Sequence, residues 1–343
     1  MISLASAKKL IDAELGVYCD DKIQQADSLN PEYGELWRVL KNYLLGGGKR
    51  LRPYLVLLSY EMYGGQQTKQ ITRIAAAWEI LHACLLIHDD IIDRDLIRHG
   101  KPNIAGSYQV RIGDEHLAMS AALIAGDLAL NGAYELITLS NLKPEQKINM
   151  HEIMHRAMYT VAGGEFLDTM SVLSSFTRVD TNSINFNKTA SYSFTSPLQT
   201  GATLAGANSS ETAKLAELGR ELGLGYQLSD DLLGVFGDEA QTGKSASSDL
   251  REGKRTLLLQ LTVLGSTNTN ELLDIIAKGE SMTDGDIETI KKAMQTSGAV
   301  DKIHETVREH TAKAQDAIRG LQVSPDYKNE LRNLAQKLES RLA

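Results

Sequence analysis

Two clusters of aspartates are the residues of this chain whose types and spacing best suit chemistry. The first, HDDIIDRD at residues 88–95, follows the apolar run at residues 80–87. On a helix, Asp89 and Asp93 lie one turn apart on one face, where like charges destabilise the helix unless something neutralises them. Mg²⁺ can do so, because it prefers one or two carboxylates together with phosphate oxygens and water. The pair therefore indicates a magnesium site, with a solvated acidic helix end as the alternative.

The second cluster, Asp230 and Asp231 within YQLSDDLLG, also ends an apolar helix, and a loop with several glycines and lysines follows it. Two acidic pairs at the ends of two apolar helices predict carboxylates that face each other across a cavity. Several magnesium ions would then be held between them, with a diphosphate completing their coordination. The alternative is an acidic pair that is hydrogen-bonded to a neighbouring loop.

Basic residues supply candidate anion sites. In LGGGKRLRP, at residues 45–53, glycines let backbone N–H groups approach an anion and arginine offers bidentate contacts to phosphate. Arg98 and His99 add cations beyond the first acidic cluster, and Lys188 with Thr189 indicates a helix that lines the same cavity. Taken singly, the glycine-rich motif could be a charged turn between helices, and the lysine an ordinary surface residue.

Apolar residues recur at helical spacing along almost the whole chain, and no convincing run alternates with period two. A helix pair is expected before the glycine run. No break is long enough to be a linker, so we predict an all-α fold, with residues 1–343 forming one large helical bundle around a central cavity. The other predicted helices cover residues 36–45, 71–98, 115–140, 147–171, 188–207, 212–236, 256–265, 283–296, 299–321 and 327–342.

The composition narrows the classes of function. A formal net charge of −8 argues against a broad nucleic-acid surface. Cys19 and Cys84 have no metal-like or disulfide-framework spacing, and the N-terminus lacks the apolar run of a signal peptide, so we expect a cytoplasmic protein. The most membrane-like stretch, residues 117–139, is interrupted by Asp127 and Glu135. A central charge costs a spanning helix about 2.5–3.5 kcal/mol, so this stretch is predicted to be a core helix and no transmembrane segment is expected.

The motifs together resemble those of the trans-isoprenyl diphosphate synthases, or polyprenyl synthetases, of the geranylgeranyl diphosphate synthase type. The resemblance runs from about Gly46 to Thr256 and rests on the ordered set GGKRLRP, LHACLLIHDDIIDRD, RHGKP, GEFLD, KTA and YQLSDD, with two GK pairs behind it. It implies an isoprenoid-synthase fold, a homodimer and three Mg²⁺ ions per active site. The implied reaction joins isopentenyl diphosphate to an allylic diphosphate.

The resemblance also implies roles for individual residues. Magnesium would be held by Asp89 and Asp93, with Asp90 in support, and by Asp230 and Asp231 of the second cluster. Isopentenyl diphosphate would be bound by Lys49, Arg52 and His82, with His99 at a further substrate-binding position. Thr189 and Gln227 would present oxygens to the developing carbocation, and the allylic diphosphate would be gripped by Arg98, Lys188, Lys244 and Lys254. The implied catalytic set is Asp89, Asp93, Arg98, Lys188, Thr189, Gln227, Asp230, Lys244 and Lys254.

Four positions depart from the family pattern. Gly234 stands where the second cluster usually has a third acidic residue, and His99 where a second arginine is usual. Glu165 replaces the usual glutamine of the GQxxD motif, whereas Asp168 is kept. Pro197 is expected to kink or break the helix that follows the KTA motif.

The residues below Asp89 bear on product length. In the family, a bulky side chain five residues before the first acidic motif shortens the product, and here that position is the mid-sized Cys84. We therefore expect a product of about twenty carbons or more, with Trp78 either a cavity floor or a simple core residue. Two other functions stay open: a class I terpene cyclase, and a non-catalytic subunit of a heteromeric synthase.

Overall fold

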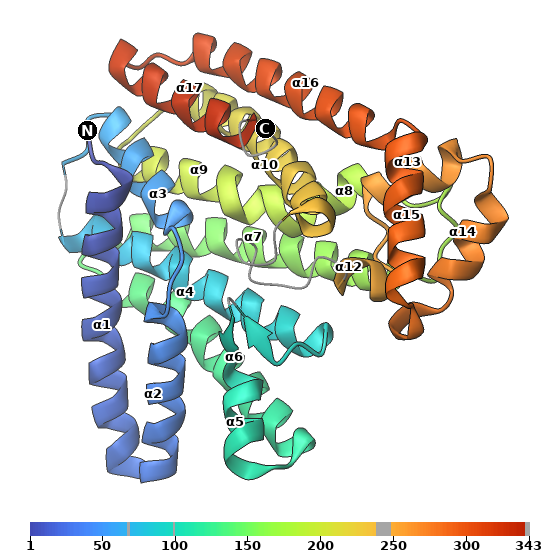
Figure 1. Cartoon of the computed structure of the whole chain (residues 1–343). Helices are drawn as coiled ribbons and strands as arrows, with labels where there is room; N and C mark the ends of the chain where they lie inside the picture. Colours follow the sequence, from blue (N-terminus) through green and yellow to red (C-terminus); the bar gives the residue numbers. More distant parts are fainter. Residues whose placement is uncertain (67–68, 99, 238–247, 340–343) are drawn as a thin grey trace. The chain divides into compact units, whose positions relative to one another are not determined.

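The structure, a computed structural model, describes residues 1–66, 69–98, 100–237 and 248–339. These residues are almost entirely helical (Figure 1), so the all-α prediction is confirmed. Within them the only strands are β1 (Ile97–Arg98) and β2 (Lys101–Pro102), which pair antiparallel. The chain divides into two compact units, Met1–Ile153 with Pro197–Ala207, and Met154–Ser196 with Asn208–Ala343. The single domain and its central cavity stay predictions.

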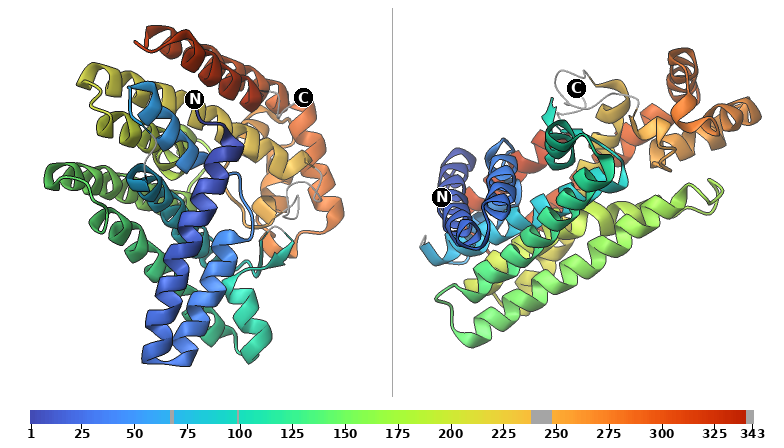
Figure 2. Two further views of the ribbon diagram at one scale, coloured as in Figure 1. Left: turned by 90° about the vertical axis from the view of Figure 1, so that its left-hand side faces the viewer. Right: turned by 90° about the horizontal axis from the view of Figure 1, so that it is seen from below.

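The first unit holds the N-terminal helices. Helices α1 and α2 run side by side (Figure 2), joined at Asn30, whose side chain caps α2 ahead of Pro31 at its first turn. Helix α4 packs on α6 and is buried around most of its circumference. The helices of this unit are α1 (Leu4–Leu29), α2 (Pro31–Leu45), α3 (Leu51–Met62), α4 (Lys69–Ile92), α5 (Ile104–Ile112), α6 (Glu115–Thr138), the start of α7 (Pro144–Ser171) and most of α9 (Ser196–Leu204).

The second unit is organised around α10 (Ser209–Phe236), which packs against η1, α16 and α17. Its apolar core includes Leu228, Leu232, Ile290 and Ile303. The other elements of this unit are the end of α7, α8 (Thr181–Asn185), the π-helix η1 (Phe186–Thr195), α12 (Ser248–Arg251), α13 (Leu257–Gly265), α14 (Thr269–Ile276), the 3₁₀ turn η2 (Gly279–Ser281), α15 (Asp284–Thr296), α16 (Ala299–Gly320) and α17 (Pro325–Glu339).

The prediction of one helix over residues 71–98 is wrong at its C-terminal end. Helix α4 stops at Ile92, Arg94 adopts a left-handed backbone with φ 58°, and the chain then forms β1 and β2. The predicted ranges did not include helices α3, α5, α8, α12 and α14. Pro197 does not break its helix, since the π-helix η1 ends at Thr195 and α9 runs on from Ser196 through Pro197.

Among the residues that the structure describes, two helices are long and apolar enough to cross a membrane, judged by length and composition alone: α4 and α6. In α4, 72% of the most apolar window is buried inside the protein, as in the core helix of a soluble protein. In α6 the buried share is only 39%. The absence of a transmembrane segment therefore stays a prediction, and the exposed face of α6 needs another explanation.

Candidate active site

The first acidic cluster occupies the C-terminal end of α4. The Asp93 N–H donates to the Asp89 carbonyl oxygen at 2.8 Å, so the helical register continues one residue past α4 and the two aspartates lie one turn apart, as predicted. Both side chains are half-buried, whereas Asp90 is only 2% exposed. Of the predicted magnesium ligands in this cluster, Asp89 and Asp93 are therefore more accessible than Asp90.

Arg98 is brought back onto this cluster by the β1–β2 hairpin. Its Nε donates to Asp90 Oδ1 at 2.8 Å, and its Nη2 lies 2.5 Å from Asp90 Oδ1 and 3.1 Å from Asp89 Oδ2. Burial by itself would lower the pKa of Arg98, but the hydrogen bond and negative charge of Asp90 outweigh it and raise that pKa. The guanidinium thus stays charged and neutralises part of the acidic cluster.

Asp90 receives a further hydrogen bond that the sequence did not indicate. The Tyr43 hydroxyl, from α2, donates to Asp90 Oδ2 at 3.3 Å. Burial and the nearby Asp90 charge raise the pKa of Tyr43, so the phenol keeps its proton. Asp90 is thereby held between Tyr43 and Arg98, which suits the supporting role predicted for it.

The glycine-rich basic motif connects α2 to α3, and its central arginine holds the connection in place. Arg50, with a left-handed φ of 54°, is 4% exposed and donates to Asp12 at 2.7 Å and to Glu79 at 2.8 Å. It also donates to the Leu44 carbonyl at 2.6 Å. Lys49 is exposed and Arg52 half-buried on either side of this anchor, as anion-binding residues require, and His82 is half-buried on α4.

In the second unit, a hydrogen-bonded chain links η1 to the second acidic cluster. The Thr189 hydroxyl donates to Gln227 Oε1 at 2.6 Å, and Gln227 Nε2 donates to Asp231 Oδ1 at 2.7 Å. Asp231 is buried and Asp230 is exposed. Asp231 therefore orients Gln227, while Asp230 presents its carboxylate at the surface of this unit.

Lys188 of η1 lies against two carboxylates of α7. Its Nζ is 2.7 Å from Asp168 Oδ2 and about equally close to both oxygens of Glu165, at 3.1 and 3.0 Å. Glu165 and Asp168 are three residues apart and so share one face of their helix. The sequence showed this spacing in GEFLD but not its partner.

Lys254 pairs with Glu252 at 2.6 Å. The neighbouring Arg255 places its guanidinium 4.1 Å from the Phe176 ring centre and donates to the Val172 carbonyl at 3.2 Å, which anchors this segment. The other two predicted cations, His99 and Lys244, lie outside the described residues.

Comparison with known proteins matches the part of the chain that contains these motifs. The family described as Polyprenyl synthetase matches residues 35–295. The chain belongs to the polyprenyl synthetase family. The predicted resemblance to trans-isoprenyl diphosphate synthases is thus confirmed, and with it the assignment as a magnesium-dependent prenyltransferase.

Among the relatives of this polyprenyl synthetase, the geranylgeranyl diphosphate synthase of Sulfolobus acidocaldarius is 33% identical over 236 residues, 67% of each chain. The octaprenyl diphosphate synthase of Escherichia coli is 32% identical over 82% of this chain and 81% of its own. The crystal structure of Corynebacterium glutamicum geranylgeranyl pyrophosphate synthase, complexed with isoprenyl diphosphate and magnesium, has a TM-score of 0.92 and 28% identity, and covers 99% of this chain and 100% of that one. The isoprenoid-synthase fold is confirmed.

The donor set of this polyprenyl synthetase fits Mg²⁺. The described residues contain no group of three His, Cys, Asp or Glu side chains that would form a complete metal cage. Asp89 and Asp93 in the first unit, and Asp230 in the second, offer hard carboxylate oxygens, and Mg²⁺ is usually bound by one or two carboxylates with substrate phosphates and water. The carboxylates of each unit therefore suit a metal that arrives with a diphosphate.

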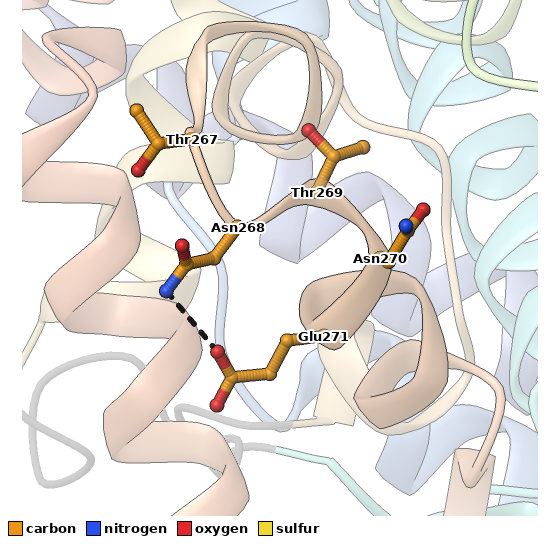
Figure 3. A pocket seen from close by; sticks show the side chains of 5 residues that line it. All are labelled: Thr267, Asn268, Thr269, Asn270 and Glu271. Atoms are coloured by element: carbon orange, nitrogen blue, oxygen red, sulfur yellow. Dashed lines mark hydrogen bonds between the residues drawn. The ribbon is translucent and has the colours of Figure 1, made fainter.

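A surface pocket in the second unit lies outside this chemistry. Figure 3 shows its lining, Thr267 to Glu271, at the start of α14. The Asn268 amide donates to Glu271 Oε2 at 3.2 Å, so these two side chains are engaged with each other. None of the predicted site residues lines the pocket, and we assign it no role.

Proposed function

We propose that this polyprenyl synthetase condenses isopentenyl diphosphate with an allylic diphosphate, giving a trans-polyprenyl diphosphate of about twenty carbons or more and pyrophosphate. The observation that carries the proposal is the buried Arg98–Asp90 pair beside Asp89 and Asp93. It fixes a guanidinium next to two accessible carboxylates, which is what a diphosphate with bound magnesium needs. The names of the relatives, geranylgeranyl, geranylfarnesyl and octaprenyl diphosphate synthases, support a product in this range.

The allylic diphosphate is the electrophile. Arg98, Lys188 and Lys254, together with the predicted Lys244, bind its phosphate oxygens and stabilise the negative charge that grows there. The C1–O bond breaks and its electron pair leaves with the diphosphate. Asp89 and Asp93, with Asp230, would hold Mg²⁺, which supplies further charge neutralisation on the leaving group when bound. We propose three such ions.

Isopentenyl diphosphate is the nucleophile. Lys49, Arg52 and His82, with His99 beside them, bind its diphosphate, and its double bond attacks C1 of the allylic cation to form the new C–C bond. A proton then leaves the adjacent carbon for the departing pyrophosphate. Thr189 and Gln227 direct oxygen atoms toward the cation, and Asp231 keeps Gln227 in that orientation.

A homodimer explains the exposed apolar face of α6. Leu117, Leu123 and Ile124 are about half-exposed on this helix, at 51%, 50% and 51%. Covering such a face removes apolar area from water, worth roughly 25 cal/mol per Å². We propose that a second copy covers it, that neither α4 nor α6 crosses a membrane, and that the protein is cytoplasmic.

One assay tests the proposed function. The purified chain is incubated with Mg²⁺, isopentenyl diphosphate and dimethylallyl, geranyl or farnesyl diphosphate in turn, and the products are sized after removal of the phosphates. We expect prenyl chains of twenty carbons or more, formed only when both substrates are present. A hydrocarbon made from the allylic diphosphate alone would instead identify a terpene cyclase, and no product from the chain alone would favour a partner subunit.

A further inference from the structure

Lys188 is a proposed diphosphate-binding cation whose charge is opposed by two contacting carboxylates in its own unit. Three carboxylate oxygens surround its ammonium group, at 2.7 Å from Asp168 and at 3.1 and 3.0 Å from Glu165. The three side chains are only 15–22% exposed, with Asp168 at 15% and Lys188 and Glu165 at 22%. This environment screens charge less than open water does, so the balance of charges matters.

The backbone brings these groups together by a close approach of α7 to η1. A Cβ added at Gly164 would lie 2.3 Å from the Lys188 backbone nitrogen, a distance that real side chains do not reach. Only glycine therefore permits this approach, and the next residue of α7 is Glu165. Lys188 lies in the π-helix η1, two residues after its start at Phe186.

One ammonium and two carboxylates give these three side chains together a formal charge of −1. The family pattern has a glutamine at position 165, with which the same group would be neutral and would still offer an oxygen to the lysine. A glutamine is nearly the same size and shape as a glutamate. The substitution in this chain therefore changes the charge beside Lys188 without removing its hydrogen-bond acceptor.

We propose that Glu165 and Asp168 are positioning residues for Lys188, and that the extra charge of Glu165 weakens the binding of the allylic diphosphate. The inference rests on the proposed function, in which Lys188 contacts that diphosphate. Asp168 makes the shortest contact and fixes the ammonium group. Glu165 makes a second contact with the ammonium group, and its charge repels the incoming phosphate oxygens.

The two parts of the proposal predict opposite changes. Glu165→Gln keeps the acceptor and removes the charge, so the KM for the allylic diphosphate falls roughly three- to tenfold, with the KM for isopentenyl diphosphate unchanged. Asp168→Ala removes the acceptor as well, so the allylic KM rises about tenfold. Asp168→Asn restores an acceptor oxygen, and its allylic KM returns to the wild-type value or below.

The control is Glu217→Gln, which changes the net charge of the protein equally at an exposed site on α10. Circular dichroism of every variant establishes that the fold is kept. An allylic KM of Glu165→Gln within twofold of wild type, or an equal shift for both substrates, would overturn the proposal for Glu165. A failure of Asp168→Asn to recover would overturn that for Asp168.

Failure of the proposed function gives a different result, because the wild-type chain would then form no condensation product. In that case the dissociation constant of Mg²⁺-pyrophosphate is measured by calorimetry in place of the KM. Tighter binding by Glu165→Gln than by wild type and Glu217→Gln supports the inference, and equal binding by all three overturns it.

Discussion

Arg98 illustrates how single residues of the site are held by charge. It pairs with Asp90, a carboxylate that is 2% exposed, and reaches Asp89 at 3.1 Å. Removing one member of a buried ion pair typically costs about 3–5 kcal/mol, because the other charge is left without a partner. Arg50 is held in the same way by Asp12 and Glu79. The stability of a variant at either arginine should therefore be measured first, because unfolding would also abolish its activity.

Tyr43 offers a milder test of the same network. Tyr43→Phe removes the 3.3 Å hydrogen bond to Asp90 and leaves the ring in place. A long hydrogen bond of this kind contributes about 0.5–1 kcal/mol, so kcat/KM should fall roughly two- to fivefold with the thermal midpoint nearly unchanged. The matched control is Tyr33→Phe on the same helix, which should behave as wild type. Equal values of kcat/KM for both variants would show that Tyr43 does not contribute to the site.

We expect a single residue, Cys84, to influence product length as well. Cys84 is fully buried on α4, about 7.5 Å before Asp89 at 1.5 Å per residue, and burial raises the pKa of its thiol to about 12. Cys84→Phe should shorten the product below twenty carbons, because the ring fills space that the growing chain needs. Cys84→Ser, similar in volume, should leave the length unchanged. An unaltered product from Cys84→Phe would show that this wall does not limit elongation.

The relative positions of site residues could be predicted best where both residues lie on one helix. The register of Asp89 and Asp93 follows from their spacing alone. The contacts of Arg98 depend on a hairpin that no hydrophobic period indicates, and Lys188 contacts α7 residues that lie 20 and 23 positions earlier in the chain. Such contacts are decided by packing between elements, which a single sequence does not display.

At the scale of elements, the crossing of α10 with η1 positions Thr189 against Gln227. Gly219 and Gly223, one turn apart on α10, make the crossing possible, because a Cβ at Gly223 would lie 2.3 Å from the Ala190 Cβ. The distance between the two helices at this point thus depends on the absence of side chains. The same approach brings the Thr189 hydroxyl within 2.6 Å of Gln227.

Gly223→Ala tests this packing. The added methyl must push η1 away, which typically costs about 1–3 kcal/mol and should lower the thermal midpoint. Gly16→Ala is the matched control, since no atom lies within 4 Å of its added Cβ in α1. That change should stabilise by about 0.5–1 kcal/mol through helix propensity. Two shifts of the same sign would contradict the proposed crossing.

Most helices could be predicted because apolar residues recur clearly at helical spacing. The residues at which helices end could be predicted less well. The sequence predicts a helix that continues to residue 98, because the apolar pattern continues through Ile91, Ile92, Leu96 and Ile97. The left-handed backbone at Arg94 interrupts it. Pro197 is expected from the sequence to kink or break its helix, but the helical backbone continues through it, from the π-helix η1 into α9.

At the scale of the whole molecule, the exposed face of α6 bears on assembly. Leu123→Asp places a charge where we propose that a second copy packs, so dimer dissociation should become about 100-fold easier or more. Sedimentation equilibrium measures this directly. Val17→Asp, at an exposed position of α1, should leave the oligomeric state unchanged. A wild-type chain that is monomeric at all concentrations would refute the dimer.

We propose that both aspartate clusters serve one reaction. The direct measurement compares condensation by wild type, Asp89→Ala and Asp230→Ala at saturating Mg²⁺, with helical circular dichroism recorded for each protein. We predict that either substitution abolishes detectable product while the dichroism stays that of wild type. Full elongation by both folded variants would contradict the account, because the reaction would then proceed without the carboxylates on which it depends.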